Sequence, residues 1–358
     1  MIRLDGVGKT YADETVAVHD LSLSVPRGAL VCLVGPSGCG KSTTLKMVNR
    51  LIEPTTGTIT VDGVDVRSSD PVELRRHIGY VIQQVGLFPH QTIRTNVATV
   101  PSLLGWPRAR SAERADELLE LVGLDPSVYG GRYPHALSGG ERQRVGVARA
   151  LAADPPVLLM DEPFGAVDPI NRGMLQEEFH RLQRSLGKTV MLVTHDIDEA
   201  VRLGDLVAVF APGGRLVQYA TPAELLGRPA DDFVAEFVGA SRGLRRLAVT
   251  PIRVEDLVSP VEAGPVVEPG PVVEPVETPG RGVSTSSTSA GRSTDGQVDV
   301  SASLEDALAV MMRQDEPVVR VVQDGEVLGV LTPEAIHTAL RRSVAEGELD
   351  ASDRAGAS

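Results

Sequence analysis

Residues 35–43 read Gly-Pro-Ser-Gly-Cys-Gly-Lys-Ser-Thr, with two glycines five positions apart directly before a lysine and a serine. This spacing matches a phosphate-binding loop, in which glycines let the backbone curl so that successive N–H groups surround phosphate oxygens. The flanks agree, because 29–34 is an apolar run of the buried-strand type and 42–51 favours a helix. An ordinary glycine-rich turn is disfavoured, since the glycines, the Lys-Ser pair and the strand–helix frame occur together.

The lysine and the serine carry the chemistry of this loop. Lys41 supplies a positive charge for the β- and γ-phosphates of a nucleotide, and Ser42 offers a hydroxyl oxygen to Mg²⁺. The helix that begins here adds N-terminal N–H groups and its dipole. The predicted nucleotide-binding residues of the loop are Gly35, Pro36, Ser37, Gly38, Cys39, Gly40, Lys41, Ser42 and Thr43.

The composition limits what kind of protein surrounds the loop. The 358 residues allow about two domains, and the formal net charge of −13 argues against a nucleic-acid-binding surface. The only two cysteines, Cys32 and Cys39, indicate a reducing compartment and no disulfide framework. We find neither the apolar run of a signal peptide nor the ~18 apolar residues of a membrane span. We therefore expect a cytoplasmic chain that needs another subunit for any membrane role.

Two carboxylates end an apolar run further along the chain. Asp161 and Glu162 follow Pro-Val-Leu-Leu-Met at 156–160. The first acid after such a strand suits Mg²⁺ coordination, and the second suits a general base that polarises the attacking water. A merely solvated strand end is less favoured, because the chain already carries a phosphate-binding loop.

Three isolated side chains are weaker candidates on their own. Gln83 leaves a predicted strand, where its amide either orients water or Mg²⁺ or satisfies a loop backbone. His195 follows the predicted strand 189–194 and can contact a γ-phosphate, although a lone histidine is more often structural. Tyr11 lies 30 residues before Lys41, where it either stacks on adenine or is an ordinary strand-edge tyrosine.

A second anion-binding element is predicted at Ser138-Gly139-Gly140, which opens an arginine-rich helix running to Ala152. A hydroxyl, bare N–H groups and the positive end of a helix dipole together favour an anion. The alternative is an N-cap followed by flexible glycines.

The order of elements predicts an α/β fold. Residues 1–28 alternate as antiparallel strands do, 57–66 reads as a hairpin, and about 92–155 looks helical. Strands alternate with helices across 29–210, which indicates a largely parallel sheet with helices on both faces.

Together these motifs resemble the ATP-binding subunit of an ABC transporter over about the first 240 residues. The resemblance implies a P-loop NTPase cassette with a mostly parallel sheet core, an antiparallel β subdomain and a helical subdomain. Residues 35–43 resemble the Walker A motif, 157–161 the Walker B motif and 137–143 the family signature, with Glu141 at a position where glutamine is also common. Single residues match as follows: Glu162 the catalytic carboxylate, Gln83 the Q-loop, Asp168 the D-loop, His195 the switch histidine and Tyr11 the adenine-stacking aromatic.

The resemblance also implies a mechanism and partners. Two copies would pair head to tail, with each ATP and its Mg²⁺ between Lys41 of one and Ser138, Gly139 and Gly140 of the other. Ser42, Gln83 and Asp161 would hold the Mg²⁺. ATP binding would close the homodimer, hydrolysis through Glu162 with His195 would reopen it, and the motion would reach a membrane permease beside 83–90.

A finer resemblance concerns the solute. Residues 78–90, 168–179 and 194–200 resemble the importers of glycine betaine, carnitine, choline and related osmoprotectants. The expected protein is thus an ATP hydrolase at the cytoplasmic face of the membrane, partnered by permease subunits and a solute-binding protein. None of these residues can touch a transported solute, so the substrate class is an analogy. Importers for polyamines, methionine or an inorganic anion remain alternatives.

The C-terminal third changes in composition. After an ATP-binding domain over 1–240, we predict a low-complexity Pro/Ser/Thr-rich linker over 241–297 that cannot bury a core. Residues 298–345 resemble a single CBS motif, a small α+β unit, with 249–257 as a displaced lead-in, and 346–358 form a tail. A lone motif of this size folds poorly by itself, so we expect it to pair with its copy. Sensing of ionic strength or nucleotide and a vestigial packing role are equally favoured.

Other classes of protein fit less well. Chromosome-type ABC ATPases insert a long coiled coil between the Walker motifs, whereas Lys41 and Asp161 lie 120 residues apart. Translation-type members carry two cassettes, and repair-type members use cysteine-rich zinc sites. A non-hydrolysing nucleotide sensor would have lost Lys41, Glu162 or His195. Exporters more often fuse membrane spans to the cassette.

Overall fold

The computed structural model describes residues 1–83, 85–165, 167, 169–239, 242–258, 296–314 and 318–343. The chain divides into two compact units, Met1–Leu225 with Pro229–Ala240, and Leu226–Arg228 with Ser241–Ser358. Within the described ranges, no helix combines the length and apolar character that crossing a membrane requires.

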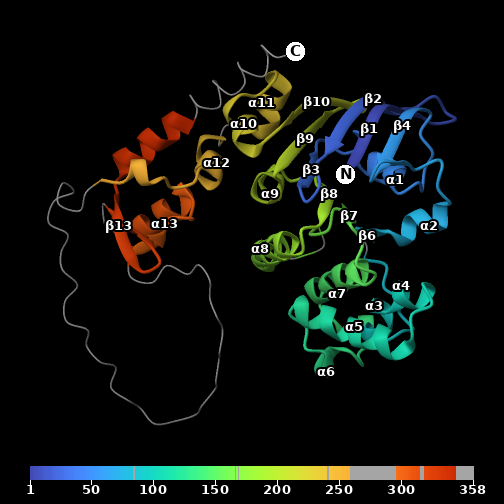
Figure 1. Ribbon diagram of the computed structural model, residues 1–358. Coiled ribbons are helices and arrows are strands. Elements are labelled where there is room, and N and C mark those ends of the chain that lie inside the picture. The colour runs from blue at the N-terminus through green and yellow to red at the C-terminus, as the bar shows by residue number, and fades with distance from the viewer. Residues whose placement is uncertain are drawn as a thin grey trace, which may run out of the picture. The chain divides into compact units, whose positions relative to one another are not determined.

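A six-stranded sheet forms the centre of the first unit (Figure 1). Its strands, in the order β10-β9-β3-β8-β7-β6, are β10 (Arg215–Ala220), β9 (Leu206–Ala211), β3 (Leu30–Val34), β8 (Thr189–Val193), β7 (Val157–Asp161) and β6 (Ile78–Val81). All neighbours pair in parallel except β9 and β10. Every residue of β3, β7 and β8 is buried, which explains their continuous apolar runs. The predicted largely parallel sheet is confirmed.

A second, antiparallel sheet has the order β2-β1-β4-β5. It contains β1 (Ile2–Thr10), β2 (Val16–Val25), β4 (Thr56–Val61) and β5 (Val64–Asp65). Asp62 and Gly63 both have positive φ, as the turn of a tight hairpin requires. The inward face joins the core of the central sheet, because Leu21 and Ile59 share one buried cluster with Phe210.

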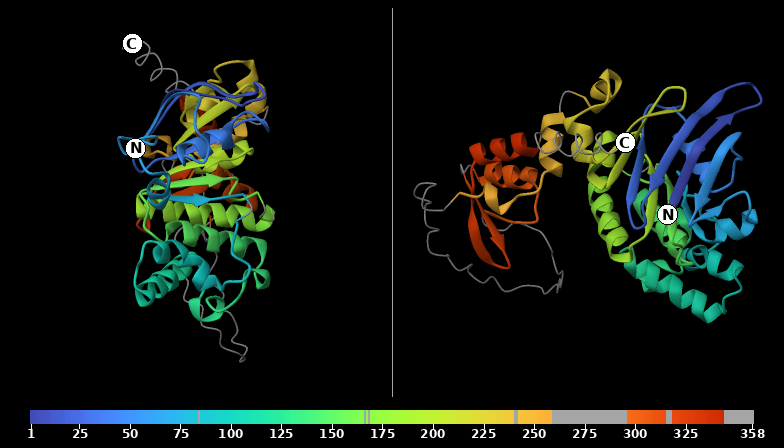
Figure 2. Two further views of the ribbon diagram at one scale, coloured as in Figure 1. Left: turned by 90° about the vertical axis from the view of Figure 1, so that its right-hand side faces the viewer. Right: turned by 45° about the horizontal axis from the view of Figure 1, so that its top comes forward.

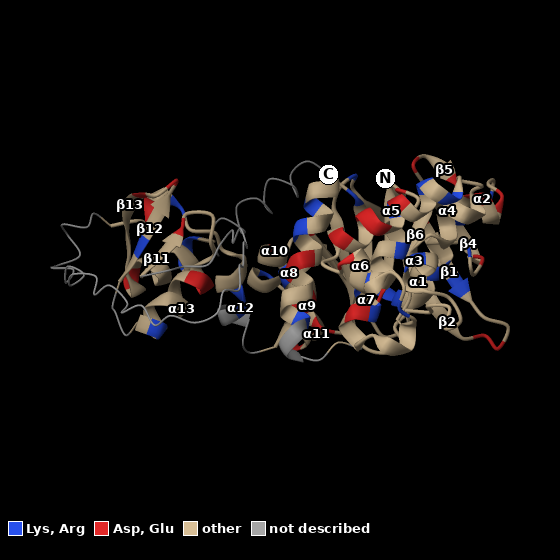
Figure 3. Ribbon diagram, turned by 90° about the horizontal axis from the view of Figure 1, so that it is seen from below, with Lys and Arg blue, Asp and Glu red and all other residues tan. Residues whose placement is uncertain are grey.

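Helix α1 (Lys41–Val48) packs against β2 and β4 of one sheet and β7 and β8 of the other. The other helices beside the sheets are α2 (Pro71–Arg76), α8 (Pro169–Leu186), α9 (Ile197–Leu203), α10 (Pro222–Gly227) and α11 (Asp232–Val238). In Figure 3, acidic and basic residues are interspersed along the described helices rather than separated by sign.

A group of helices forms the predicted helical subdomain, which lies at one end of the first unit (Figures 1 and 2). It comprises α3 (Ile93–Val97), α4 (Thr99–Leu103), α5 (Arg108–Leu121), α6 (Pro126–Tyr129), a 3₁₀ turn at Pro134–Ala136 and α7 (Gly139–Leu151). Helix α7 is the centre of this packing, since it contacts α3, α5 and strand β6.

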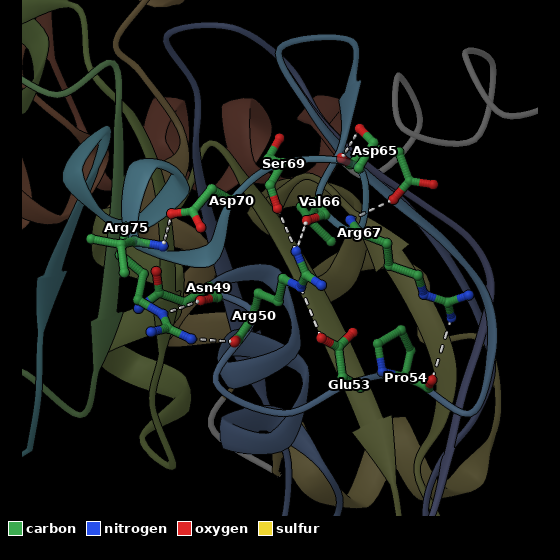
Figure 4. A network of polar contacts seen from close by, with 12 residues as sticks. Asn49, Arg50, Glu53, Pro54, Asp65, Val66, Arg67, Ser69, Asp70 and Arg75 are labelled. Carbon is green, nitrogen blue, oxygen red and sulfur yellow. Dashed lines mark hydrogen bonds and ion pairs between the residues drawn. The ribbon is translucent and has the colours of Figure 1, made fainter.

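Arginines fix the end of α1 to the segments around it (Figure 4). Arg75 of α2 donates to the carbonyl oxygens of Asn49 and Arg50 over 3.3 and 2.7 Å. Arg50 in turn donates to the carbonyls of Val66 and Ser69. The bonds from Arg75 satisfy carbonyls that the end of α1 leaves without partners, and those from Arg50 join this end to residues 66–69, so the helix that follows the phosphate-binding loop is held at its far end.

The second unit is a small α+β structure. Its sheet has the order β11-β12-β13, with β11 (Gln297–Asp299) parallel and β13 (Glu326–Leu331) antiparallel to β12 (Val319–Gln323). Helix α13 (Leu304–Gln314) and residues 333–343, which are also helical, complete it. The order helix–strand–strand–helix, with β11 before it, agrees with the small α+β unit expected for residues 298–345.

The beginning of the predicted linker belongs to this second unit. Residues 242–249 form α12 (Arg242–Val249), and a 3₁₀ turn follows at Val254–Asp256. Leu247 and Ile252 lie in the same buried cluster as Val321, so this segment has a core, contrary to the low-complexity assignment from 241 onward. Residues 259–295 of the predicted Pro/Ser/Thr-rich linker and the predicted tail over 346–358 lie outside the described residues.

Candidate functional site

The glycines of the phosphate-binding loop stand where a side chain has no room. Gly35 has φ +149°, and a Cβ atom there would lie 2.3 Å from the carbonyl oxygen of Phe210. Gly40 has φ +92°, and its Cβ would lie 2.1 Å from the carbonyl oxygen of Ala17. The loop between β3 and α1 therefore needs glycine at both ends for its curl, and a phosphate-binding role explains the curl.

Lys41 lies inside this loop. Its side chain is buried, with a relative exposure of 6% for the residue, and Nζ donates to the carbonyl oxygens of Gly35 and Pro36 over 2.7 and 2.9 Å. Cys39 is buried beside it, with Sγ 3.5 Å from Nζ, whereas Ser37 and Gly38 form the exposed tip. A cation enclosed by a backbone curl fits a phosphate group. Cys32 and Cys39 are both free thiols.

Ser42 and Asp161 meet at the edge of the loop. Ser42 Oγ donates to Asp161 Oδ1 over 2.8 Å, which joins the first turn of α1 to the end of β7. Within the described residues, no group of three or more His, Cys, Asp or Glu side chains gathers as a metal site. A hydroxyl and a single carboxylate fit Mg²⁺, which typically takes one or two protein oxygens and completes its shell with water and phosphate.

The side chains that follow three neighbouring strands meet at the carboxylate of Glu162. Gln83 Nε2 donates to Glu162 Oε2 over 2.8 Å, and His195 Nδ1 lies 3.4 Å from the same oxygen. The three residues follow β6, β7 and β8, which are neighbours in the sheet. The backbone of Glu162 has φ +47°, and its N–H donates to the carbonyl of Val193. The strained conformation is typical of a functional position.

The N-terminus of α7 has a complete capping box. Ser138 Oγ accepts from the N–H of Glu141, and the Glu141 carboxylate accepts from the N–H of Ser138. The N–H groups of Gly139 and Gly140 take no part in the box, so these two donors of the predicted anion-binding element remain available to an anion. Tyr129 of α6 donates its hydroxyl to Glu141 Oε1 over 2.7 Å. The hydrogen bond to Glu141 holds the Tyr129 phenol in its neutral form and raises its pKa.

Two predicted residues stand apart from these groups. Tyr11 follows β1 and is exposed, with Lys9 Nζ 5.3 Å from the centre of its ring. The ring is therefore available for stacking, and an adenine contact stays a prediction. Asp168 lies outside the described residues. The structure thus joins Ser42 to Asp161 and brings Gln83 and His195 to Glu162, as the shared sheet edge predicts.

Sequence reasoning missed several polar residues near this site. Tyr129 had no local signal, although the Ser-x-x-Glu pattern at 138–141 indicates the capping box. Glu199 and Arg172 were also missed. They lie on α9 and α8, two helices that contact each other, and their positions follow from helix packing rather than from a motif.

The glycine loop, the enclosed lysine and the Ser42–Asp161 pair define a nucleotide-binding domain of the phosphate-binding-loop class. Residues 18–165 match the family model described as ABC transporter. The chain belongs to the ABC transporter family, as its similarity to curated relatives also shows. Members of this class bind and hydrolyse ATP.

Curated relatives and a solved structure agree with this family. The chain is 53% identical over 259 residues to the choline transport ATP-binding protein OpuBA of Bacillus subtilis, covering 72% of this chain and 68% of that protein. It is 56% identical over 242 residues to the glycine betaine/carnitine/choline transport ATP-binding protein OpuCA of the same organism, covering 68% and 63%. The chain thus spans about two thirds of the length of these relatives.

Among solved structures, the dimeric post-hydrolysis state of the ATP-binding cassette MJ0796, bound to ADP and Pi, matches with a TM-score of 0.56 and 34% identity. That match covers 62% of this chain and 99% of the other.

Proposed function

We propose that this chain is the ATP-hydrolysing subunit of an importer for osmoprotectants of the quaternary-amine class, such as glycine betaine, carnitine or choline. The convergence of Gln83 and His195 on Glu162, beside the phosphate-binding loop, supports hydrolysis. The names of the relatives at 53% and 56% identity support the solute class.

The residues divide the work of hydrolysis between them. The loop N–H groups and Lys41 hold the β- and γ-phosphates. Ser42 and Asp161, with Gln83, would hold Mg²⁺, which neutralises phosphate charge when bound. Glu162 accepts a proton from the attacking water, and the hydrogen bond from Gln83, together with the nearby ring of His195, orients that carboxylate. Tyr11 stacks on the adenine ring.

The active form is a head-to-tail homodimer. One copy offers the Lys41 loop, and the other offers Ser138, Gly139 and Gly140 at the start of α7, with Asp168 near the contact. The capping box supports this, because it leaves the glycine N–H groups for an anion that comes from outside the chain. A related domain, the MJ0796 cassette, was solved as a dimer bound to ADP and Pi, which supports pairing between two copies.

A permease subunit of the membrane docks beside the segment that follows Gln83. A cavity of about 280 Å³ lies there, lined among others by Asn49, Arg75, Tyr80 and Arg149. Arg149 donates to the carbonyls of Val85 and Gly86, and so links that cavity to the Gln83 loop. The chain is then peripheral at the cytoplasmic face, and a solute-binding protein delivers the solute from outside.

We also propose that the second unit is a CBS-like domain. Val327 and Leu328 of β13 are exposed, whereas Val330 in the same strand is bridged to Val258, so the exposed part of the strand offers a short apolar patch for pairing with its copy. Whether that pairing regulates transport is tested by truncation before residue 242.

Uptake tests the solute class. Cells that lack this chain and any redundant importer are complemented with the wild type or with Glu162→Gln, and uptake of radiolabelled glycine betaine is measured at high osmolarity. We expect uptake with the wild type and none with the variant. Unchanged uptake without the chain would reject the solute class while leaving the ATPase intact, and competition with polyamines, methionine and anions would follow.

A further inference from the structure

Glu199 is a buried carboxyl behind the loop that carries His195. It belongs to α9, and only 6% of the residue is exposed. Thr194, which precedes His195, donates its hydroxyl to Glu199 Oε2 and accepts a hydrogen bond from the N–H of Asp196 over 3.0 Å. The hydroxyl of Thr194 therefore connects Glu199 to the two residues that flank His195, Thr194 and Asp196.

The other oxygen of Glu199 is unused. Oε1 is buried and has no hydrogen-bond partner within the described residues, and the same holds for Nε of Arg172 on α8. Arg172 also donates from Nη2 to the carbonyl of Val167 over 3.1 Å, next to the segment that leads into α8. A buried acceptor and a buried donor without partners are costly, and these two groups carry opposite charges.

We propose that Glu199 is a positioning residue that pairs with Arg172 and thereby couples the His195 loop to the segment at Val167 when the catalytic site closes. This rests on the ATP hydrolysis in the proposed function and is independent of the transported solute. The ion pair gives Glu199 Oε1 and Arg172 Nε the partners that they lack. It also links the segment at Val167, which Arg172 of α8 contacts, to the His195 loop, which Glu199 of α9 contacts.

The charge of Glu199 is sensitive to pH in the neutral range. Burial raises the pKa of its carboxyl to about 7; the hydrogen bond from the Thr194 hydroxyl lowers that pKa, as do Arg172 and His195, and Asp196 raises it. The thiol of Cys32 on β3 also faces this carboxyl, and burial keeps that thiol neutral by raising its pKa. Because only the ionised carboxylate pairs fully with Arg172, coupling strengthens as the pH rises through about 7.

Steady-state ATP hydrolysis by the purified full-length chain tests the coupling between pH 5.5 and 8.5. In the wild type, kcat is expected to rise with pH, with the midpoint of this acid limb near pH 7. Glu199→Gln keeps the size and the acceptor for Thr194 but cannot ionise, so it should lose the limb and show a kcat reduced about tenfold at pH 8 with little change in KM. Glu177→Gln removes the same charge from an exposed position of α8 and should leave the profile unchanged.

Arg172→Gln provides the second arm. Without the cation, the ionised carboxylate of Glu199 has no partner for the ion pair, so Arg172→Gln should lose the acid limb as Glu199→Gln does, and Arg172→Lys should restore part of it. An acid limb that persists unchanged in Glu199→Gln belongs to another group, such as His195, and overturns the proposal. A wild type without ATPase activity would instead contradict the proposed function, and Glu162→Gln measured alongside sets that baseline.

Discussion

Ser42 Oγ donates a hydrogen bond to Asp161 Oδ1 over 2.8 Å, although 119 residues separate the two in the chain. The contact exists because α1 starts, and β7 ends, at the same edge of the parallel sheet. Phosphates held by the loop would lie beside this pair, so one carboxylate and one hydroxyl are placed where a phosphate-bound Mg²⁺ needs oxygen ligands.

Asp161→Asn therefore tests the metal. The variant keeps the shape and loses the charge, and we expect ATP hydrolysis with saturating Mg²⁺ to fall by about 100-fold. Nucleotide binding in the presence of a chelator should stay unchanged, as measured by fluorescence with a labelled ATP analogue. Asp154→Asn, which removes an exposed carboxylate just before β7, is the matched control. Equal losses in both variants would contradict a metal role for Asp161.

Glu162→Gln tests the general base. The amide keeps a partner for Gln83 and His195 but cannot accept the proton from water, so we expect turnover to fall by about 10²–10⁴-fold while ATP binding persists. ATP should then trap a closed dimer, visible by size-exclusion chromatography. Adding His195→Ala should cost little more, because both residues act on one step. Hydrolysis at the wild-type rate in Glu162→Gln would remove Glu162 from this role.

The capping box of α7 predicts a difference between two substitutions of one residue. Glu141→Gln keeps a carbonyl oxygen that accepts from the N–H of Ser138 and an amide N–H that can donate to the Tyr129 hydroxyl, whereas Glu141→Ala keeps neither bond. We expect only the alanine variant to lose about 1 kcal/mol of stability in urea unfolding and to form less ATP-dependent dimer. Tyr129→Phe should show an intermediate effect. If Gln and Ala behave alike, the hydrogen bonds of the box do not hold the anion-binding element.

Burial of Glu199 also predicts how stability depends on pH. Its folded pKa of about 7 lies above the ordinary 4.5, so the folded state binds more protons between these values and stability falls as pH rises through that window. The cost of ionising it approaches ~3 kcal/mol above pH 7. Glu199→Gln should therefore be more stable than the wild type at pH 8 and equal to it at pH 4.5 in urea unfolding. A constant difference across this range would show that its environment does not disfavour the charge.

Much of the fold was readable from the sequence because the signals are local. The apolar runs that form β3, β7 and β8 are buried along their whole length, and the hairpin predicted at 57–66 is present with its turn at Asp62-Gly63. The segment from 242 was wrongly assigned to the low-complexity linker because arginines are interspersed with the apolar residues of α12. Its apolar face is evident only in the structure, where Leu247 lies in the core of the second unit.

The sequence alone determined the loop that binds phosphate, the sheet that carries it and the identity of the polar residues at the strand ends, because these depend on spacing within one segment. Only the tertiary structure decided which of them touch. The hydrogen bond from Gln83 to Glu162, the bond between Tyr129 and Glu141, and the buried carboxyl of Glu199 each join segments whose approach is set by packing. Strand order and helix packing, rather than any motif, bring those atoms within bonding distance.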